Sequence, residues 1–142
     1  MKTRIVRGGN INDVLSKKFN ILIGISLGNK WFNKKNLEAY VYWALKYSKD
    51  KVLVWVGDKI HAVNYEVKNY QKPENALRRA INEGDKKIVL IREILSELSS
   101  KEKQKVEVIR CEDLEVLEFH KERRDFLYKK FNIDVKFRQE IF

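Results

Sequence analysis

Residues 21–29 read ILIGISLGN, a short apolar run that ends in a glycine-containing turn. A continuous, β-branched run of this length is typical of a strand buried on both faces of a parallel sheet. After the turn at Gly28-Asn29, Asn33 can cap a helix whose apolar residues recur at helical spacing. The segment therefore predicts a first strand followed by a helix that packs one face on the sheet.

A second apolar run, KVLVWV at residues 51–56, predicts another buried strand. A strand, a helix and a strand joined by short loops form a right-handed βαβ unit, so the two strands should be parallel neighbours. Residues 73–98 predict a long amphipathic helix, although Gly84 costs about 1 kcal/mol relative to alanine and leaves a split into two helices open. Residues 106–110 predict a further strand, and residues 113–131 a charged helix. We therefore expect an α/β protein with a Rossmann-like parallel sheet flanked by helices.

The 142 residues are the usual size of one domain, and no repeat, low-complexity segment or linker divides them. Residues 1–19 are polar and basic and predict an irregular lead-in with loose order. The apolar runs are too short for a membrane span and no signal peptide is recognised, which predicts a cytoplasmic protein. One cysteine, Cys111, and two distant histidines, His61 and His120, give neither a disulfide nor a metal-ligand cluster. We expect no metal, no cofactor and a monomer.

The formal net charge of +10 is concentrated in the first half of the chain, where residues 1–71 hold 13 Lys and Arg against 5 Asp and Glu. Residues 72–142 hold 17 against 15. Such an excess raises the local concentration of polyanions such as RNA at low salt. Lys121 and Arg124 alternate with acidic residues, so that part of the chain is expected to be a solvated, ion-paired helix face. The charge favours a polyanionic partner.

Ser26 follows the first predicted strand, at the carboxyl edge of the sheet where open α/β folds bind their ligands. With a proton acceptor and amide donors nearby, its hydroxyl can act as a nucleophile; alternatively, Ser26 is a small polar residue satisfied by turn amides. Gly24, Ser26 and Gly28 also match the G-x-S-x-G nucleophile elbow of α/β-hydrolases. Hydrolases need several strands before the elbow and a downstream acid and histidine. A serine hydrolase is therefore the least favoured function.

The segment LIGISLGN at residues 22–29, followed by Trp31-Phe32, resembles the catalytic-serine segment of the cyclodipeptide synthases. The features that follow it in that family occur here in the same order: the helix of residues 34–48, the strand end at Val56-Gly57-Asp58, the stretch around His61 and Tyr65, and the helix that carries Arg78 and Arg79. The resemblance covers residues 19–142. It implies a fold similar to the catalytic domain of tyrosyl- and tryptophanyl-tRNA synthetases.

The resemblance also implies an activity, that of an aminoacyltransferase that uses aminoacyl-tRNAs to form a cyclodipeptide. Ser26 would take the aminoacyl group from one tRNA as an ester, and a second aminoacyl-tRNA would supply the amine, in a ping-pong acyl transfer. Gly24 and Asn29 would hold the aminoacyl group. Leu22 and Trp55 would line the pocket for the first side chain, and Phe119 would be a further substrate-binding residue. The tRNA phosphates would be contacted by Arg78, Arg79, Lys86 and Lys87.

Two features depart from the family pattern. Asn20 stands where the family usually has a histidine. The second catalytic motif, a tyrosine and a glutamate followed closely by a proline, would lie beyond residue 142. We therefore expect a short member that lacks the C-terminal part of the family fold, and a noncatalytic or truncated tRNA-binding relative is the alternative function.

Three residues near Ser26 have roles that the sequence leaves open. Trp31 and Phe32 either stack on a terminal base or anchor their loop to the core, and we expect the anchoring role. His61 either serves as an acid or base or lies exposed in a polar loop after the second strand, and we expect the exposed loop.

Overall fold

The computed structural model describes residues 10–136 and residue 139. The chain divides into two compact units, Met1–Cys111 and Glu112–Phe142. The first element in the described part of this unit is helix α1, Ile11–Leu15, where the Asn10 side chain accepts a hydrogen bond from the Asn12 amide at 2.9 Å. The expectation of an irregular lead-in over residues 1–19 is therefore wrong for this helical turn, and residues 1–9 lie outside the described part.

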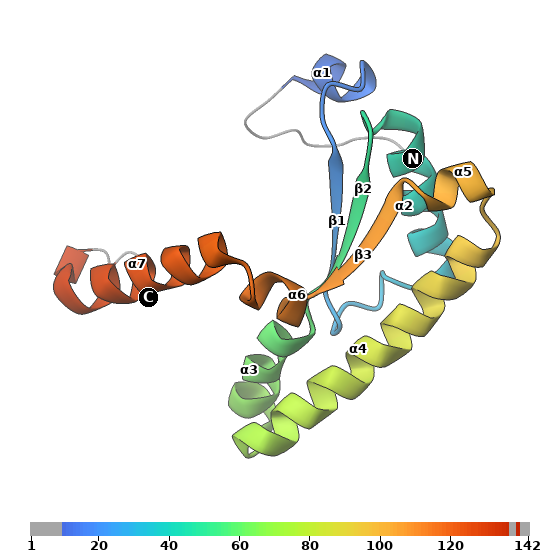
Figure 1. Ribbon diagram of the computed structural model, residues 1–142. Coiled ribbons are helices and arrows are strands. Elements are labelled where there is room, and N and C mark those ends of the chain that lie inside the picture. Colours follow the sequence, from blue (N-terminus) through green and yellow to red (C-terminus); the bar gives the residue numbers. More distant parts are fainter. Residues whose placement is uncertain (1–9, 137–138, 140–142) are drawn as a thin grey trace. The chain divides into compact units, whose positions relative to one another are not determined.

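Three parallel strands form the sheet of the first unit: β1 (Ile21–Ile25), β2 (Val52–Val56) and β3 (Val106–Arg110), in the order β1-β2-β3 (Figure 1). Ile23 is aligned with Val54 of β2, and Val54 with Val108 of β3. The predicted parallel pairing of the first two strands is confirmed. The expected fold class, a Rossmann-like parallel sheet flanked by helices, is also confirmed.

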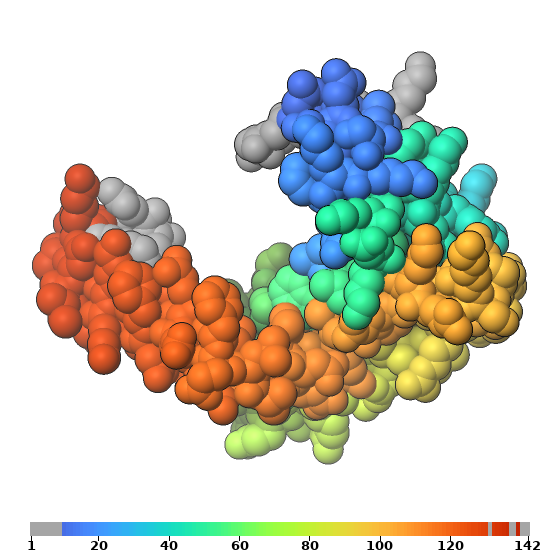
Figure 2. Space-filling model, turned by 45° about the horizontal axis from the view of Figure 1, so that its top comes forward, coloured from blue at the N-terminus to red at the C-terminus, as the bar shows by residue number. Residues whose placement is uncertain are grey.

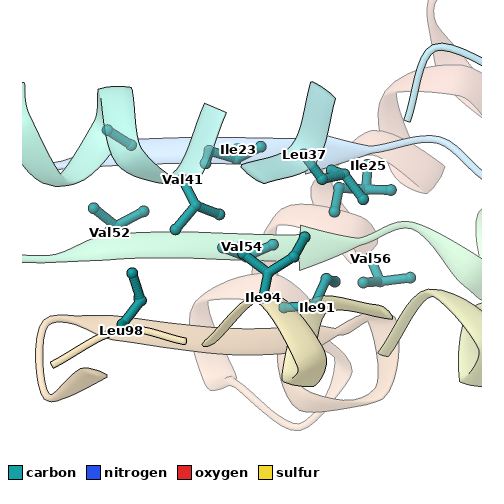
Figure 3. Close-up of a cluster of buried hydrophobic side chains, with 11 residues drawn as sticks. Ile23, Ile25, Leu37, Val41, Val52, Val54, Val56, Ile91, Ile94 and Leu98 are labelled. Carbon is teal, nitrogen blue, oxygen red and sulfur yellow. The ribbon is translucent and has the colours of Figure 1, made fainter. Parts of the chain in front are cut away.

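Helices α2 (Lys34–Tyr47) and α4 (Pro73–Ser96) supply the core that covers one face of this sheet (Figures 1 and 3). Helix α2 begins where predicted, because the Asn33 side chain accepts a hydrogen bond from the Asn36 amide. A short helix, α5 (Ser100–Lys103), leads from α4 to β3. The buried core consists of Ile23, Ile25, Leu37, Val41, Ala44, Val52, Val54, Val56, Ile91, Ile94 and Leu98.

The other face of the sheet is more open. Leu22 of β1 is 57% exposed, and Trp55 of β2 and Ile109 of β3 are half-buried. The expectation that β1 is buried on both faces is therefore wrong. An apolar side chain at an open position gives the same sequence pattern as one at a covered position, so the run of apolar residues did not distinguish the two.

Helix α3 (Asp58–Asn69) follows β2 directly and was not predicted. It packs on α4 through small buried residues, Ala62 on one side and Ala76 and Ala80 on the other. Helix α4 continues through Gly84 without a break, so the chain does not form two helices there. The pair α3 and α4 thereby extends past the carboxyl edge of the sheet (Figure 1).

Helix α6 (Cys111–Glu115) crosses the boundary between the units, and α7 (Glu118–Ile133) forms most of the second unit. The single helix predicted for residues 113–131 is thus interrupted after Glu115. Several apolar side chains of the second unit are at least half exposed: Val116, Leu117, Phe119, Phe126, Tyr128, Ile133 and Val135. Across residues 10–136, no helix is both long enough and apolar enough to cross a membrane.

Candidate active site

Ser26 lies in the first position after β1, at the carboxyl edge of the sheet, and is exposed. A cavity of about 330 Å³ surrounds this position. In Figure 2, blue atoms of β1 and the loop after it lie next to green atoms of β2 and α3. The cavity is lined by Gly24, Ile25, Ser26, Trp55, Gly57, Ile60, His61 and Asn64. Residues from two strands and one helix therefore meet around the predicted nucleophile.

A tight turn follows Ser26, in which the Asn29 amide donates to the Ser26 carbonyl oxygen at 3.4 Å. Gly28 in this turn lies against the His61 ring: a Cβ on Gly28 would lie 2.7 Å from Cε1 and 3.1 Å from Nε2 of His61. Any side chain at position 28 would displace the imidazole or the turn. The glycine is therefore required by a close approach between the loop and α3.

His61 lies on α3, half-buried, and the expectation of an exposed polar loop is wrong. Its Nδ1 atom lies 3.2 Å from Nδ2 of Asn64, and the Tyr65 ring meets the imidazole edge-on with 4.8 Å between ring centres. Burial lowers the pKa of His61 below its ordinary value of 6.5, and the positive charges of Lys68 and Arg79 lower it further. The imidazole is consequently neutral at pH 7.

Trp55 is paired in register with Gly24, so both residues face the same side of the sheet. A Cβ on Gly24 would lie 3.9 Å from Cε3 of Trp55. The indole Nε1 of Trp55 is buried and has no hydrogen-bond partner among the described residues. Leu22 lies on the same side as Trp55, two residues earlier in the register, where it is paired with Leu53, and it remains exposed. The predicted pair of Leu22 and Trp55 thus shares a face, with Trp55 the closer to Ser26.

The loop between Ser26 and α2 is held by polar contacts of its own. The Asn29 side chain accepts a hydrogen bond from the Trp31 amide at 2.9 Å. The indole Nε1 of Trp31 donates to the Tyr40 hydroxyl at 2.8 Å, and Phe32 packs against the core. The predicted anchoring role of Trp31 and Phe32 agrees with these contacts. Phe119, predicted to contact substrate, lies on α7 in the second unit and is 77% exposed.

Three of the four predicted tRNA-binding cations line a surface hollow of about 590 Å³ on α4, together with Asn75 and Asn82. Arg78 donates to Oδ1 of Asn75 at 2.9 Å, and Lys86 is paired with Glu83 at 2.8 Å. Arg79 lies over the Tyr65 ring, with its guanidinium carbon 4.2 Å from the ring centre. The hollow therefore presents cationic groups beside amide side chains and the Glu83 carboxylate.

Lys87, the fourth predicted cation, has a different partner. Its Nζ donates to the carbonyl oxygen of Phe32 at 2.6 Å, a part-buried bond between residues 55 positions apart. The bond joins α4 to the loop that carries Ser26. Lys87 therefore anchors the loop and does not line the hollow.

A buried ion pair beside the site was not predicted from the sequence. Asp58 is 2% exposed, and its Oδ2 accepts from Nε and Nη2 of Arg110, each at 2.6 Å. Nη1 of Arg110 also contacts Asp85 of α4 at 2.6 Å. The pair thus connects the start of α3 with the end of β3 and with α4. Among the described residues, no group of three or more His, Cys, Asp or Glu could hold a metal ion.

The structure carries the fold of several solved cyclodipeptide synthases. A Mycobacterium tuberculosis protein, whose structure relates cyclodipeptide synthetases to type I tRNA synthetases, matches with a TM-score of 0.76 and 21% identity over 90% of this chain and 56% of its own. A cyclodipeptide synthase from Fluoribacter dumoffii matches with a TM-score of 0.72 and 16% identity, over 94% and 58%. One from Streptomyces noursei matches with a TM-score of 0.67 and 21% identity, over 85% and 56%.

The chain therefore spans little more than half the length of these structures. No curated protein sequence matches it. The family model for cyclodipeptide synthases matches residues 7–141, which is nearly the whole chain. The chain belongs to the cyclodipeptide synthase family.

Proposed function

We propose that this chain uses aminoacyl-tRNAs to form a cyclodipeptide, by way of an aminoacyl ester on Ser26. The observation that carries the proposal is the position of Ser26 in the wall of a cavity at the carboxyl edge of a parallel sheet, with Gly24 and Trp55 beside it. In a member of this family, a hydroxyl at this position can reach the acyl group of a substrate that is bound in the cavity.

The proposed reaction has three bond exchanges. The Ser26 hydroxyl oxygen attacks the carbonyl carbon of the first aminoacyl ester, the bond from that carbon to the ribose oxygen breaks, and the hydroxyl proton ends on the ribose oxygen. The amine of a second aminoacyl-tRNA then attacks the Ser26 ester, which forms a peptide bond and restores the hydroxyl. Finally, the free amine of the dipeptidyl-tRNA attacks its own ester, so that the cyclic product leaves and the second tRNA is released.

The walls of the cavity support roles for the predicted binding residues. Gly24 has no side chain, so an acyl group can approach the strand beside Ser26. The Trp55 ring supplies apolar surface for the substrate side chain. The Asn29 side chain supports the loop from within, through its bond to the Trp31 amide.

The hollow on α4 supports the predicted contact with tRNA phosphates. Arg78 and Lys86 line it from exposed positions, where phosphates would compete with Asn75 and Glu83 for their charged groups and displace counterions on binding. Arg79 is partly used by its stack on Tyr65. A tRNA-binding relative without catalysis would use the same surface, and is the second candidate function.

The serine hydrolase has less support. A nucleophile elbow is a strand, a sharp turn and a helix in direct succession, whereas α2 begins only at Lys34. The G-x-S-x-G pattern at residues 24–28 thus occurs here without the elbow geometry.

The test is intact-protein mass spectrometry of the purified chain after mixing with a pool of charged tRNAs, with Ser26→Ala as the control. The proposal expects mass increases equal to aminoacyl residues in the wild type and none in Ser26→Ala. An unmodified chain that still binds tRNA would favour the noncatalytic relative. Analysis of the same mixture for cyclic dipeptides tests whether the second transfer also takes place.

A further inference from the structure

Acylation of Ser26 requires a group that carries its proton. The hydroxyl proton must leave the serine oxygen and reach the departing ribose oxygen, and a positioned side chain that does this typically accelerates a reaction by about 10²–10⁴-fold. Among the described residues that line the Ser26 cavity, only His61 titrates near neutral pH. Its placement therefore bears directly on the mechanism.

Three neighbours fix the orientation of the His61 ring. Asn64 is within hydrogen-bond distance of Nδ1, Tyr65 meets the ring edge-on, and the backbone of Gly28 lies close to Cε1 and Nε2. A Cβ on Gly28 would be 3.1 Å from Nε2 but 3.9 Å from Nδ1. The Nε2 side of the imidazole therefore faces the turn that begins at Ser26.

The partner of Nδ1 can support both neutral forms of the ring. A neutral imidazole has one nitrogen that donates and one that accepts, and an asparagine amide offers both an NH₂ donor and an oxygen acceptor. The structure places Nδ2 of Asn64 against Nδ1; a half-turn of the amide puts its oxygen there instead, and when that oxygen accepts from Nδ1–H, Nε2 is left unprotonated on the side of the Ser26 turn. A histidine oriented by an asparagine is also the arrangement of the Cys-His-Asn proteases.

We propose that His61, oriented by Asn64, carries the proton in the acylation of Ser26; the role rests on the proposed function. Nε2 takes the proton from the Ser26 hydroxyl as the bond from the serine oxygen to the acyl carbon forms. It gives the same proton to the ribose oxygen as the ester bond to the tRNA breaks. The imidazole begins and ends neutral, and no other reactant is consumed.

The charges around His61 suit this role. Lys68 of α3 and Arg79 of α4 are the cationic groups that lower its pKa, the Tyr65 ring is in edge-on contact with it, and Gly28 of the loop after β1 approaches it without a charged side chain. The ring is therefore neutral and available as a base at pH 7, and it loses this ability only at acid pH, where it is protonated.

The experiment measures modification of Ser26 with two reagents, a small fluorophosphonate and a pool of aminoacyl-tRNAs, each followed by intact mass. The variants are His61→Gln and Asn64→Ala, with Val63→Ala, an exposed position of the same helix, as the matched control. His61→Gln should slow modification by about 10²–10⁴-fold, and Val63→Ala should not. In the wild type the rate should rise with pH with a midpoint below 6.5, and this rise should be absent in His61→Gln.

The two reagents separate failure of this inference from failure of the proposed function. If the fluorophosphonate labels Ser26 in a His61-dependent manner and aminoacyl-tRNA does not react, the inference stands and the proposed function fails. If His61→Gln keeps the wild-type rate and pH profile, the inference is overturned. It is equally overturned if neither reagent modifies Ser26 of the wild type. Thermal melting curves of the variants that match the wild type show that slower modification does not result from unfolding.

Discussion

Gly84, in the middle of α4, lies directly against Asp58 at the start of α3. A Cβ on Gly84 would be 2.8 Å from the Asp58 Cβ and 3.0 Å from Nη2 of Arg110. Glycine at this position lets the buried ion pair of Asp58 and Arg110 lie on the surface of α4 without a gap. A residue that weakens an isolated helix is therefore what allows this helix to pack.

Gly84→Ala should destabilise the protein. In an exposed helix position the change from glycine to alanine stabilises by up to about 1 kcal/mol, but here the methyl group meets the Asp58 Cβ, which cannot rotate away. Overpacking of this kind costs about 1–3 kcal/mol. The free energy of unfolding, measured in urea, shows whether Gly84→Ala stabilises or destabilises the protein. Asn82→Ala, on an exposed turn of α4, is the matched control and should not lower it.

Asp58 should make the protein sensitive to acid. Burial raises the pKa of Asp58, but the hydrogen bonds from the Lys59 amide, Arg110 and Cys111 together hold it below the ordinary value of 3.8. The unfolded chain then binds the proton more readily, so this stabilisation is complete above about pH 4 and is lost as the pH falls through the folded-state pKa.

Asp58→Asn tests this directly. The variant should be less stable than the wild type at pH 7, by about 3 kcal/mol, because Arg110 loses a buried partner. Its stability should also fall less steeply than that of the wild type below pH 4. Urea titrations from pH 2.5 to pH 7 provide the comparison. Parallel curves for the two proteins would assign the acid sensitivity to other carboxylates.

The sequence predicted the sheet of the first unit well, because Ile21–Ile25 and Val52–Val56 are continuous apolar runs bounded by turn residues. It predicted α2 equally well, since Asn33 is a strong cap. It missed α3, where Ile60, Val63 and Val67 recur at helical spacing but lie exposed, and where the helix packs instead through the small Ala62. That helix is stabilised by its packing on α4, a contact between segments that local pattern does not report.

The residues of the candidate site were likewise predicted only in part. Ser26 and Gly24 were found because they follow a recognisable strand within one short segment. His61 was placed in an exposed loop, since its place beside Ser26 depends on the start of α3 directly after β2. Lys87 looked equivalent to Lys86 in sequence, but consecutive residues of a helix point about 100° apart, so Lys86 faces solvent beside Glu83 whereas Lys87 reaches the Phe32 carbonyl oxygen.

Trp55→Leu should change the preferred first aminoacyl group. The smaller side chain enlarges the cavity beside Ser26, so larger aminoacyl groups should gain in rate over small ones. A difference of one methylene group in such a cavity is worth about 10- to 200-fold in rate. The masses of the acylated chain report the preference. The control is Leu53→Ala, two residues earlier on the same face and outside the cavity wall, which should leave the substrate preference unchanged. An unchanged preference in Trp55→Leu would show that Trp55 does not line the substrate pocket.

The cations of the hollow should determine how tRNA binding depends on salt. Each phosphate contact adds about 0.9 to the slope of log K against log salt concentration. The double variant Arg78→Ala/Lys86→Ala should therefore reduce this slope by about 2 and weaken binding to all tRNAs alike. Lys101→Ala, on α5, is the control of equal charge change per site. The slope is measured by filter binding between 50 and 300 mM salt. An equal decrease of the slope in the double variant and in Lys101→Ala would contradict the assignment.

The loop after Ser26 is held at each end and in its middle. Gly28 rests on His61, Trp31 donates to Tyr40, and Lys87 holds the Phe32 carbonyl. The conformational entropy of this loop is thus lost when the chain folds. A substrate that arrives meets a surface already in its final shape, so its binding energy is not diminished by ordering the loop around it.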